Sequence, residues 1–249
     1  MLILVTGASA GFGEAISERL IGDGHRVVGV ARRKDRLEEL RARLGPAFHP
    51  HVLDIADEAA TSALLESLPP EWRAVDVLVN NAGLALGLDN AQSARVDDWR
   101  RMIDINVIGL TLLTRAVLPG MVERNAGHII NIGSTAGTYP YPGGNVYGAT
   151  KAYVRQFSLN LRADLAGTAV RVSNIEPGLV GGTEFSVVRF NGDKEEAQKR
   201  YEGVTPLTAA DIAETVAWIT SLPKHVNVNT IELMPVAQTF GALQISRNG

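Results

Sequence analysis

Short runs of β-forming residues alternate along this chain with segments of helical periodicity, and this alternation limits the possible folds more than any other feature. The β-type runs are residues 2–6, 26–30, 51–53, 75–79, 128–133, 171–176 and 230–234. Between them lie amphipathic stretches such as residues 35–44, where Leu37, Leu40 and Leu44 share one helical face. Strands that alternate with helices form a parallel sheet covered on both faces. The sequence therefore predicts an α/β, doubly wound parallel sheet of about seven strands. Residues 1–249 form one domain in this prediction, because no linker or composition shift divides them.

Charge and composition narrow the classes of partner. The formal net charge is -3, so there is no bulk attraction to nucleic acid or to an anionic membrane. The apolar runs are shorter than the roughly 20 residues that span a bilayer, and the first one begins at Leu2 without a leader pattern. The chain has no cysteine, and the closely spaced His49 and His51 have no third ligand nearby. We expect a cytoplasmic protein without a metal site.

A glycine-rich turn, residues 6–13, directly follows the first β-type run and opens a helical pattern. Such a turn alone is compatible with a tight strand-to-helix connection. Here the strand before it and the helix after it supply the context in which a pyrophosphate rests on a helix N-terminus. The sequence thus predicts a dinucleotide site.

The end of the second β-type run predicts which nicotinamide coenzyme is bound. An acidic residue at this position would bind the ribose 2′-hydroxyl. The chain instead carries Arg32 and Arg33, with no carboxylate before Asp35. Two guanidinium groups suit a 2′-phosphate. We therefore predict NADP, the alternative being that both arginines are solvated side chains at the start of the next helix.

Candidate catalytic groups follow the fifth β-type run. Ser134 ends that run, and Tyr147 and Lys151 lie four residues apart, which places them on one face of a helix. A free phenol has a pKa of about 10, so a base near neutral pH needs a shift of roughly 3 units, or about 4 kcal/mol. We expect Lys151 and the positive nicotinamide ring to favour the phenolate, and Ser134 to hydrogen-bond the substrate oxygen.

An ordered set of motifs runs along the chain: residues 6–13, 80–83, Asn106, Ser134, Tyr147 with Lys151, and Pro177-Gly178. Through this set the chain resembles the short-chain dehydrogenases/reductases across essentially its whole length. The resemblance implies that Asn106 completes a catalytic tetrad and carries a water linked to Lys151, and that the protein is a homotetramer. With the two arginines, the expected coenzyme contacts are Gly7, Ser9, Gly11, Phe12, Gly13, Arg32, Arg33, Asp54, Ile55, Asn80, Ala82, Gly83, Tyr147, Lys151, Pro177, Gly178, Leu179, Val180 and Thr183.

Within that family, a closer resemblance is carried by residues 83–87, 133–137, 143–147 and 176–185. In these stretches the chain resembles the 3-hydroxy acid dehydrogenase branch, which includes serine and allo-threonine dehydrogenases and malonic semialdehyde reductases. The substrate would be a small anionic hydroxy acid or its aldehyde. The expected substrate contacts are Ser134, Asn145, Tyr147 and Arg189.

Residues 181–203 break the strand-helix rhythm, which is typical of a substrate lid, and Arg189 in this lid is the candidate cation for the carboxylate. The alternative is an Arg189 exposed to solvent. The stretch 139–142 either walls the substrate pocket or is only a rigid turn.

Two other functions stay open from the sequence. A sulfoacetaldehyde (isethionate) reductase needs the same cationic anchor, because a sulfonate is also an anion. A non-catalytic NADP-binding sensor is the alternative from another class, and the presence of Ser134, Tyr147 and Lys151 counts against it.

Overall fold

Seven strands form one parallel sheet in the order β3-β2-β1-β4-β5-β6-β7 in the computed structural model, which describes residues 1–190, 192–199 and 201–240. The strands are β1 Leu2–Thr6, β2 Arg26–Ala31, β3 Phe48–Val52, β4 Val77–Asn80, β5 Gly127–Ile132, β6 Val170–Pro177 and β7 Thr230–Leu233. Every neighbouring pair is parallel. The predicted fold class is confirmed. Most strand ends lie within one residue of the prediction, and the larger differences are at two starts: β3 begins at Phe48 rather than residue 51 and β4 begins at Val77 rather than residue 75.

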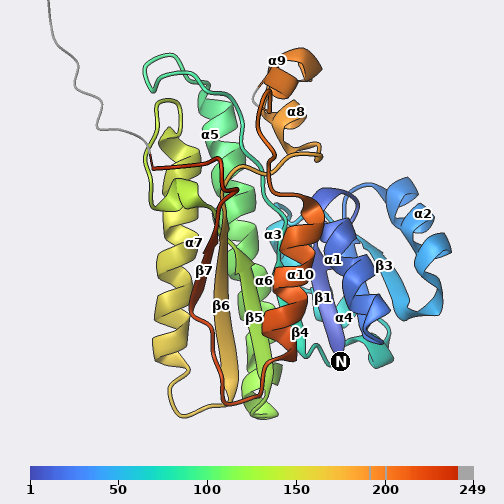
Figure 1. Ribbon diagram of the computed structural model, residues 1–249. Coiled ribbons are helices and arrows are strands. Elements are labelled where there is room, and N and C mark those ends of the chain that lie inside the picture. Colours follow the sequence, from blue (N-terminus) through green and yellow to red (C-terminus); the bar gives the residue numbers. More distant parts are fainter. Residues whose placement is uncertain (191, 200, 241–249) are drawn as a thin grey trace, which may run out of the picture.

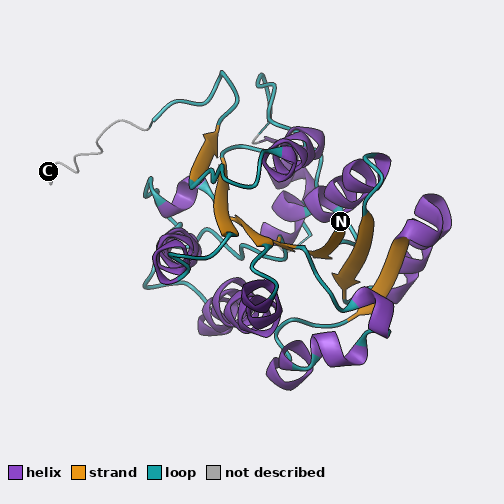
Figure 2. Ribbon diagram, turned by 90° about the horizontal axis from the view of Figure 1, so that it is seen from below, coloured by secondary structure: helices purple, strands orange, loops and turns teal. Residues whose placement is uncertain are grey.

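Helices cover both faces of the sheet (Figures 1 and 2). They are α1 Gly11–Gly22, α2 Lys34–Leu44, α3 Glu58–Ser62, α4 Leu64–Ser67, α5 Val96–Ile103, α6 Leu110–Glu123, α7 Asn145–Asp164, α8 Phe185–Arg189, α9 Lys194–Lys199 and α10 Ala209–Ser221. A capping box opens α10, because the Thr208 side chain accepts from the backbone of Asp211 and the Asp211 carboxylate accepts from the backbone of Thr208.

The two apolar cores follow from the alternation of side chains along each strand. In β1, Leu2 and Leu4 belong to a core shared with α4, α6 and α7. Ile3 and Val5 point to the opposite face and join α1, α2 and α10. Because both faces are buried, β1 is apolar at four successive positions, as expected for a central strand of a parallel sheet.

A long helix, Val96–Glu123, runs through α5, a π-helical turn at Asp104–Gly109 and α6. Within the described part of the chain it is the one helix with the length and apolar composition to cross a membrane. Its apolar side chains Leu113, Val117 and Met121 are instead buried in the core against the sheet. A core helix of this kind has the same composition as a membrane span.

The carboxyl ends of the strands meet at one edge of the molecule, where α8 and α9 lie above the sheet (Figure 1). From β1 the chain continues to β2 on one side, while β4 pairs with the other side of β1. The loops after β1 and β4 therefore diverge and leave a crevice between them. Open α/β sheets bind their ligands at such a point.

Candidate active site

A cavity of about 690 Å³ occupies this crevice and extends from the glycine-rich turn after β1 to the first turn of α7. One end is lined by the turn and by the two arginines after β2. The other end is lined by Ser134, Tyr147 and Lys151, and α8 contributes to the wall above them. The cavity thus joins the predicted coenzyme groups to the predicted catalytic groups.

At the coenzyme end, the glycines of the turn are required by close backbone contacts. Gly7 and Gly11 have φ of 68° and 56°, which side-chain-bearing residues rarely adopt. A Cβ atom at Gly13 would lie 2.3 Å from the Gly7 carbonyl oxygen. No side chain caps the N-terminus of α1, whose N-cap residue is Ala10. The free N–H groups of this turn can therefore bind phosphate oxygens.

Thr6 joins the turn to the end of β4. Its Oγ1 accepts hydrogen bonds from the backbone N–H groups of Asn81 (3.0 Å) and Ala82 (2.8 Å). The Asn81 side chain donates in return to the Thr6 carbonyl at 2.8 Å. Asn81 consequently lines the cavity, whereas the side chain of Asn80 lies beneath it.

The placement of Asn80 corrects the sequence-based expectation that it contacts coenzyme. Its Nδ2 donates to Thr114 (2.9 Å) and to Asn131 (2.8 Å), and the residue is buried below the cavity floor. Successive side chains at the end of a strand point to opposite faces, so only one of the two asparagines can face the crevice.

Four charged side chains surround the end of β2. Arg32 lies 3.8 Å from Asp54, and Arg33 lies 2.9 Å from Glu184 at the start of α8. Arg33 also donates to the Ser9 carbonyl and Oγ, at 3.4 Å each. These guanidinium groups line the cavity mouth and are positioned to meet an anion there.

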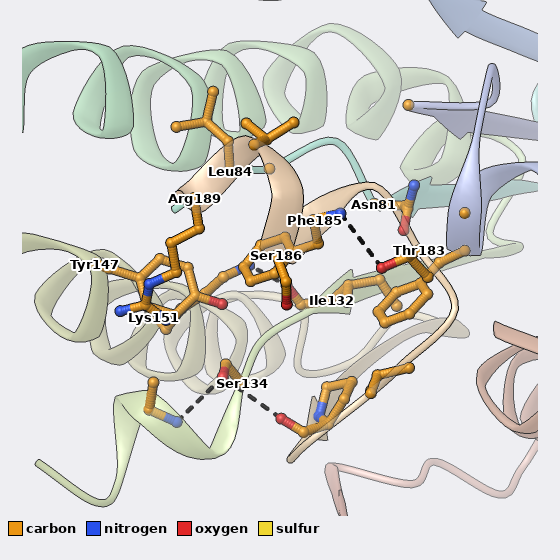
Figure 3. Close-up of a pocket in the computed structure, with 18 of the residues that line it drawn as sticks. Asn81, Leu84, Ile132, Ser134, Tyr147, Lys151, Thr183, Phe185, Ser186 and Arg189 are labelled. Carbon is orange, nitrogen blue, oxygen red and sulfur yellow. Dashed lines mark hydrogen bonds between the residues drawn. The ribbon is translucent and has the colours of Figure 1, made fainter. Parts of the chain in front are cut away.

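The catalytic end is built by β5 and α7. Ser134 lies just beyond β5, and its Oγ accepts from the Ala136 N–H at 3.1 Å and donates to the Pro177 carbonyl at 3.4 Å (Figure 3). Tyr147 and Lys151 lie on successive turns of α7, with the Lys151 Nζ 5.9 Å from the centre of the Tyr147 ring. The structure brings together the three groups that the sequence predicted.

Burial dominates the acidity of Tyr147. It raises the pKa of the phenol to about 12, and the hydrogen bond with Ser134 and the charge of Arg189 act in the opposite direction. From the sequence we expect Lys151 together with the positive nicotinamide ring to lower this pKa. In the chain by itself the removal of water outweighs these favourable contacts.

Lys151 and Asn106 form a second layer beside the phenol. Burial lowers the pKa of Lys151 to about 8, and its Nζ donates to the Ile132 carbonyl at 2.8 Å. Asn106 lies in the π-helical turn, a local widening often found at functional sites. Its side chain accepts from the Leu84 N–H and donates to the Leu84 carbonyl, both at 2.9 Å. Asn106 therefore fixes the loop that carries Gly83.

Arg189, the last residue of α8, is 7% exposed although it carries a charge. Its side chain lies beside Tyr147 (Figure 3), with the guanidinium 5.5 Å from the centre of that ring. The centre of the Tyr141 ring is 5.3 Å away. Among the residues that the structure describes, no carboxylate forms an ion pair with it. The alternative of a solvent-exposed arginine does not hold. A buried, unpaired guanidinium beside the catalytic groups is suited to an anionic ligand.

Most of the expected site residues line the cavity. They are Gly7, Ser9, Gly11, Phe12, Arg32, Arg33, Asp54, Ile55, Ala82, Gly83, Ser134, Tyr147, Lys151, Pro177, Gly178, Leu179, Val180, Thr183 and Arg189. Gly13 and Asn106 support the wall from behind. Asn145 does not reach the cavity, because its side chain donates to the Asp89 carbonyl at 3.0 Å and lines a separate small hollow.

Several side chains that line the same cavity were not among the contacts predicted from the sequence. They are Asn81, Leu84, Tyr141, Phe185, Ser186, Tyr201 and Gln238. Tyr141 lies in the stretch 139–142, which the sequence leaves open as either a pocket wall or a rigid turn. Asn80 and Asn81 are adjacent, and the sequence does not indicate which of the two side chains faces the cavity. For Gln238, whose Oε1 accepts from the Leu179 N–H at 2.7 Å, no local pattern indicates a contact 59 residues away.

Comparison with known proteins agrees with this geometry. The family model described as short chain dehydrogenase matches residues 1–193. The chain is 62% identical over 248 residues to the NADP-dependent 3-hydroxy acid dehydrogenase YdfG of Salmonella typhi, with 100% of both chains covered. It is 51% identical over 245 residues to the serine 3-dehydrogenase of Rhizobium radiobacter, with 98% of each covered.

A solved structure, the closed form of serine dehydrogenase complexed with NADP+, superposes with a TM-score of 0.98 at 60% identity and covers 100% of both chains. The glycine-rich turn, the Ser134, Tyr147 and Lys151 cluster and these full-length similarities lead to one conclusion: this chain belongs to the short chain dehydrogenase family.

Proposed function

We propose that this chain is an NADP-dependent dehydrogenase that transfers a hydride between nicotinamide and the β-carbon of a small 3-hydroxy acid, or its semialdehyde or keto form. The names of its full-length relatives support the coenzyme and the substrate class. The observation that carries the proposal is the buried, unpaired Arg189 beside Tyr147, because it combines an anion anchor with an acid/base group in one cavity.

The residues present fit NADP. The glycine turn leaves a backbone cradle that a Cβ atom would fill, since at Gly13 it would lie 2.3 Å from a carbonyl oxygen. Arg32 and Arg33 offer two cations where a 2′-phosphate would require them, and the end of β2 has no acidic residue to bind an unphosphorylated ribose. Thr183 and the stretch 177–180 line the cavity wall toward the catalytic end.

When bound, the coenzyme supplies or accepts the hydride. The chain's own residues move the proton and hold the substrate. With a pKa of about 12, the Tyr147 phenol is protonated near neutral pH and can donate to the oxygen of a carbonyl substrate. In the oxidative direction Tyr147 must accept the hydroxyl proton, and the positive charge of Arg189 favours the phenolate that does so.

Ser134 and Arg189 would position the substrate at its two ends. The Ser134 hydroxyl interacts with the Tyr147 hydroxyl and so lies where the reacting oxygen is needed. Arg189 would bind the carboxylate in a site largely closed to water, where a charge-assisted hydrogen bond is strong. A small substrate would thus be held between a neutral donor and a cation.

Steady-state kinetics test this proposal. We expect NADP+ to support turnover of 3-hydroxypropionate, serine and allo-threonine with a higher kcat/KM than NAD+ does, and with a higher kcat/KM than isethionate shows. Tyr147→Phe should lower kcat by about 10² to 10⁴ while coenzyme binding is retained. Tyr153→Phe, which removes a hydroxyl bonded to Thr111 outside the cavity, is the matched control.

The outcomes separate the alternatives. Faster turnover of isethionate than of every carboxylate would make the chain a sulfonate enzyme. Full activity of Tyr147→Phe would refute the acid/base role, and binding of NADP without any turnover by the wild-type protein would support the sensor.

We further propose that residues 181–203 act as a substrate lid and that the enzyme is a cytoplasmic homotetramer. The lid is supported by the ion pair between Arg33 and Glu184 and by Arg189, which connect this segment to both ends of the cavity. Limited proteolysis with and without NADP tests the lid, and sedimentation equilibrium tests the oligomer. Equal cleavage within residues 181–203 in both states, or a monomer mass, would refute the respective proposal.

A further inference from the structure

Tyr141 is held rigidly at the edge of the catalytic end, in the loop that precedes α7. Pro140 and Pro142 flank it and restrict its backbone. The ring packs on Gly144, where an added Cβ atom would lie 2.9 Å from the ring, and the Gly144 N–H donates to the Tyr141 carbonyl at 3.0 Å. The position of this hydroxyl is therefore set before any ligand arrives.

The Tyr141 hydroxyl contacts the candidate anion anchor directly. Arg189 Nη2 lies 2.7 Å from the Tyr141 oxygen. A guanidinium has only donors, so the phenol oxygen is the acceptor in this bond. The hydroxyl hydrogen of Tyr141 then remains available, because among the described residues no group accepts it. Tyr141 presents a free O–H donor next to the guanidinium.

The guanidinium itself is oriented by the loop after β4. Arg189 Nε lies 3.3 Å from the Gly87 carbonyl, and the Gly87 N–H donates to the Arg189 carbonyl at 3.1 Å. Side chain and backbone of Arg189 are thus both tied to Gly87. The guanidinium carbon lies 5.3 Å from the centre of the Tyr141 ring and 5.5 Å from that of the Tyr147 ring, so the two rings border the guanidinium.

From this arrangement we infer that Tyr141 is a specificity-determining residue that donates a hydrogen bond to the substrate carboxylate beside Arg189. The inference rests on the proposed function and deepens it by naming the anion. One fixed cation and one fixed O–H donor, joined by their own hydrogen bond, present two donor groups side by side. Two neighbouring donors match the two oxygens of a planar carboxylate better than the three oxygens of a tetrahedral sulfonate. They also select an acid over its neutral amide.

Three substrates that differ only at this group provide the test: 3-hydroxypropionate, 3-hydroxypropionamide and isethionate. Tyr141→Phe removes the hydroxyl but retains the ring beside Arg189. For this variant we expect kcat/KM for 3-hydroxypropionate to fall about tenfold or more, mainly through KM, because a hydrogen bond to a charged group is lost. The value for 3-hydroxypropionamide should change less than about threefold, and the preference for carboxylate over isethionate should shrink.

Tyr153→Phe is the matched control and should leave all three ratios unchanged, since its hydroxyl bonds Thr111 outside the cavity. Combining Tyr141→Phe with Arg189→Gln tests whether the two donors act together. If they do, the double variant loses less than the product of the single losses. Independent, multiplicative losses would contradict a shared carboxylate site.

The failures are distinguishable. If the wild-type enzyme turns over the amide as fast as the acid, Arg189 does not act as an anchor for the substrate carboxylate, and the proposed function is wrong. If the wild type prefers the acid, but Tyr141→Phe leaves kcat/KM unchanged or lowers it equally for acid and amide, the proposed function stands and the role of Tyr141 is refuted.

Discussion

The two arginines after β2 allow a quantitative prediction about coenzyme choice. In the double variant Arg32→Asp and Arg33→Ala, both cations at the cavity mouth are lost and a carboxylate is introduced. Arg33 also neutralises Glu184 at 2.9 Å, so its removal leaves that carboxylate unpaired at the same mouth. Every one of these changes disfavours a 2′-phosphate, and none adds a clash with the ribose hydroxyl of NAD.

The magnitude follows from exposure. The Arg32 and Arg33 side chains are 55% and 42% exposed, so each phosphate contact is partly screened by water and contributes about 1 kcal/mol. Repulsion by the new carboxylate adds about 1 kcal/mol at contact distance in water. The sum of about 3 kcal/mol corresponds to a change on the order of 100-fold in the affinity for NADP relative to NAD.

Equilibrium binding of both coenzymes, measured by calorimetry at two salt concentrations, checks this value. Arg36→Ala is the matched control, because Arg36 lies in the first turn of α2 just after the two arginines, pairs with Glu39 and does not line the cavity. We expect the control to keep the wild-type ratio. An unchanged ratio in the double variant would refute the assignment of the 2′-phosphate to this pair, and a loss equal for both coenzymes would indicate damage to the turn instead.

Three other perturbations have predictable results. Burial lowers the pKa of His128 to about 3, so unfolding takes up a proton at this side chain once the pH falls below about 6.5. In urea titrations the wild type should therefore lose about 2 kcal/mol more stability between pH 7 and pH 5 than His128→Gln does, and equal losses would contradict this. Gly13→Ala should weaken coenzyme binding at least tenfold in calorimetry, because its Cβ atom would press on the Gly7 carbonyl, and wild-type affinity would show that the turn can relax. Because Tyr147 is protonated at neutral pH, kcat/KM for alcohol oxidation should rise from pH 7 to pH 9 while carbonyl reduction does not; a flat oxidation profile would argue against proton transfer to this phenol.

The fold was predictable because its determinants are local in the sequence. Each strand of the central sheet is buried on both faces and reads as a short apolar run, and each helix shows its own periodicity. Strand boundaries were less accurate where polar residues occupy an edge. In β3, Phe48 is buried but His49 and Pro50 are only half-buried, so the start of that strand has no apolar pattern. Pairing with β2, rather than composition, determines where it begins.

The site was predictable where spacing determines geometry and not where the tertiary structure does. Tyr147 and Lys151 meet because four residues make about one turn of α7. Asn145 lies two residues before Tyr147, yet the helix turns its side chain toward Asp89 and away from the cavity. Arg189 was found through the need for a cation. Tyr141, which hydrogen-bonds Arg189, was not predicted as a site residue, because the two residues are 48 positions apart in the sequence.

The opposing influences on the pKa of Tyr147 connect the proposed lid to the proposed chemistry. Burial makes the phenol a poor base, and two influences of the chain lower its pKa: the hydrogen bond with Ser134 and the charge of Arg189, which belongs to α8 and not to the sheet. Lys151 lies lower, bound to the Ile132 carbonyl, with its own pKa reduced to about 8. Closure of α8 over the cavity would therefore bring the substrate anchor and a stabilising charge for the phenolate to the site together. A carboxylate bound to Arg189 would in turn offset part of that charge, so oxidation of an acid depends on the positive nicotinamide ring more than oxidation of a neutral alcohol does.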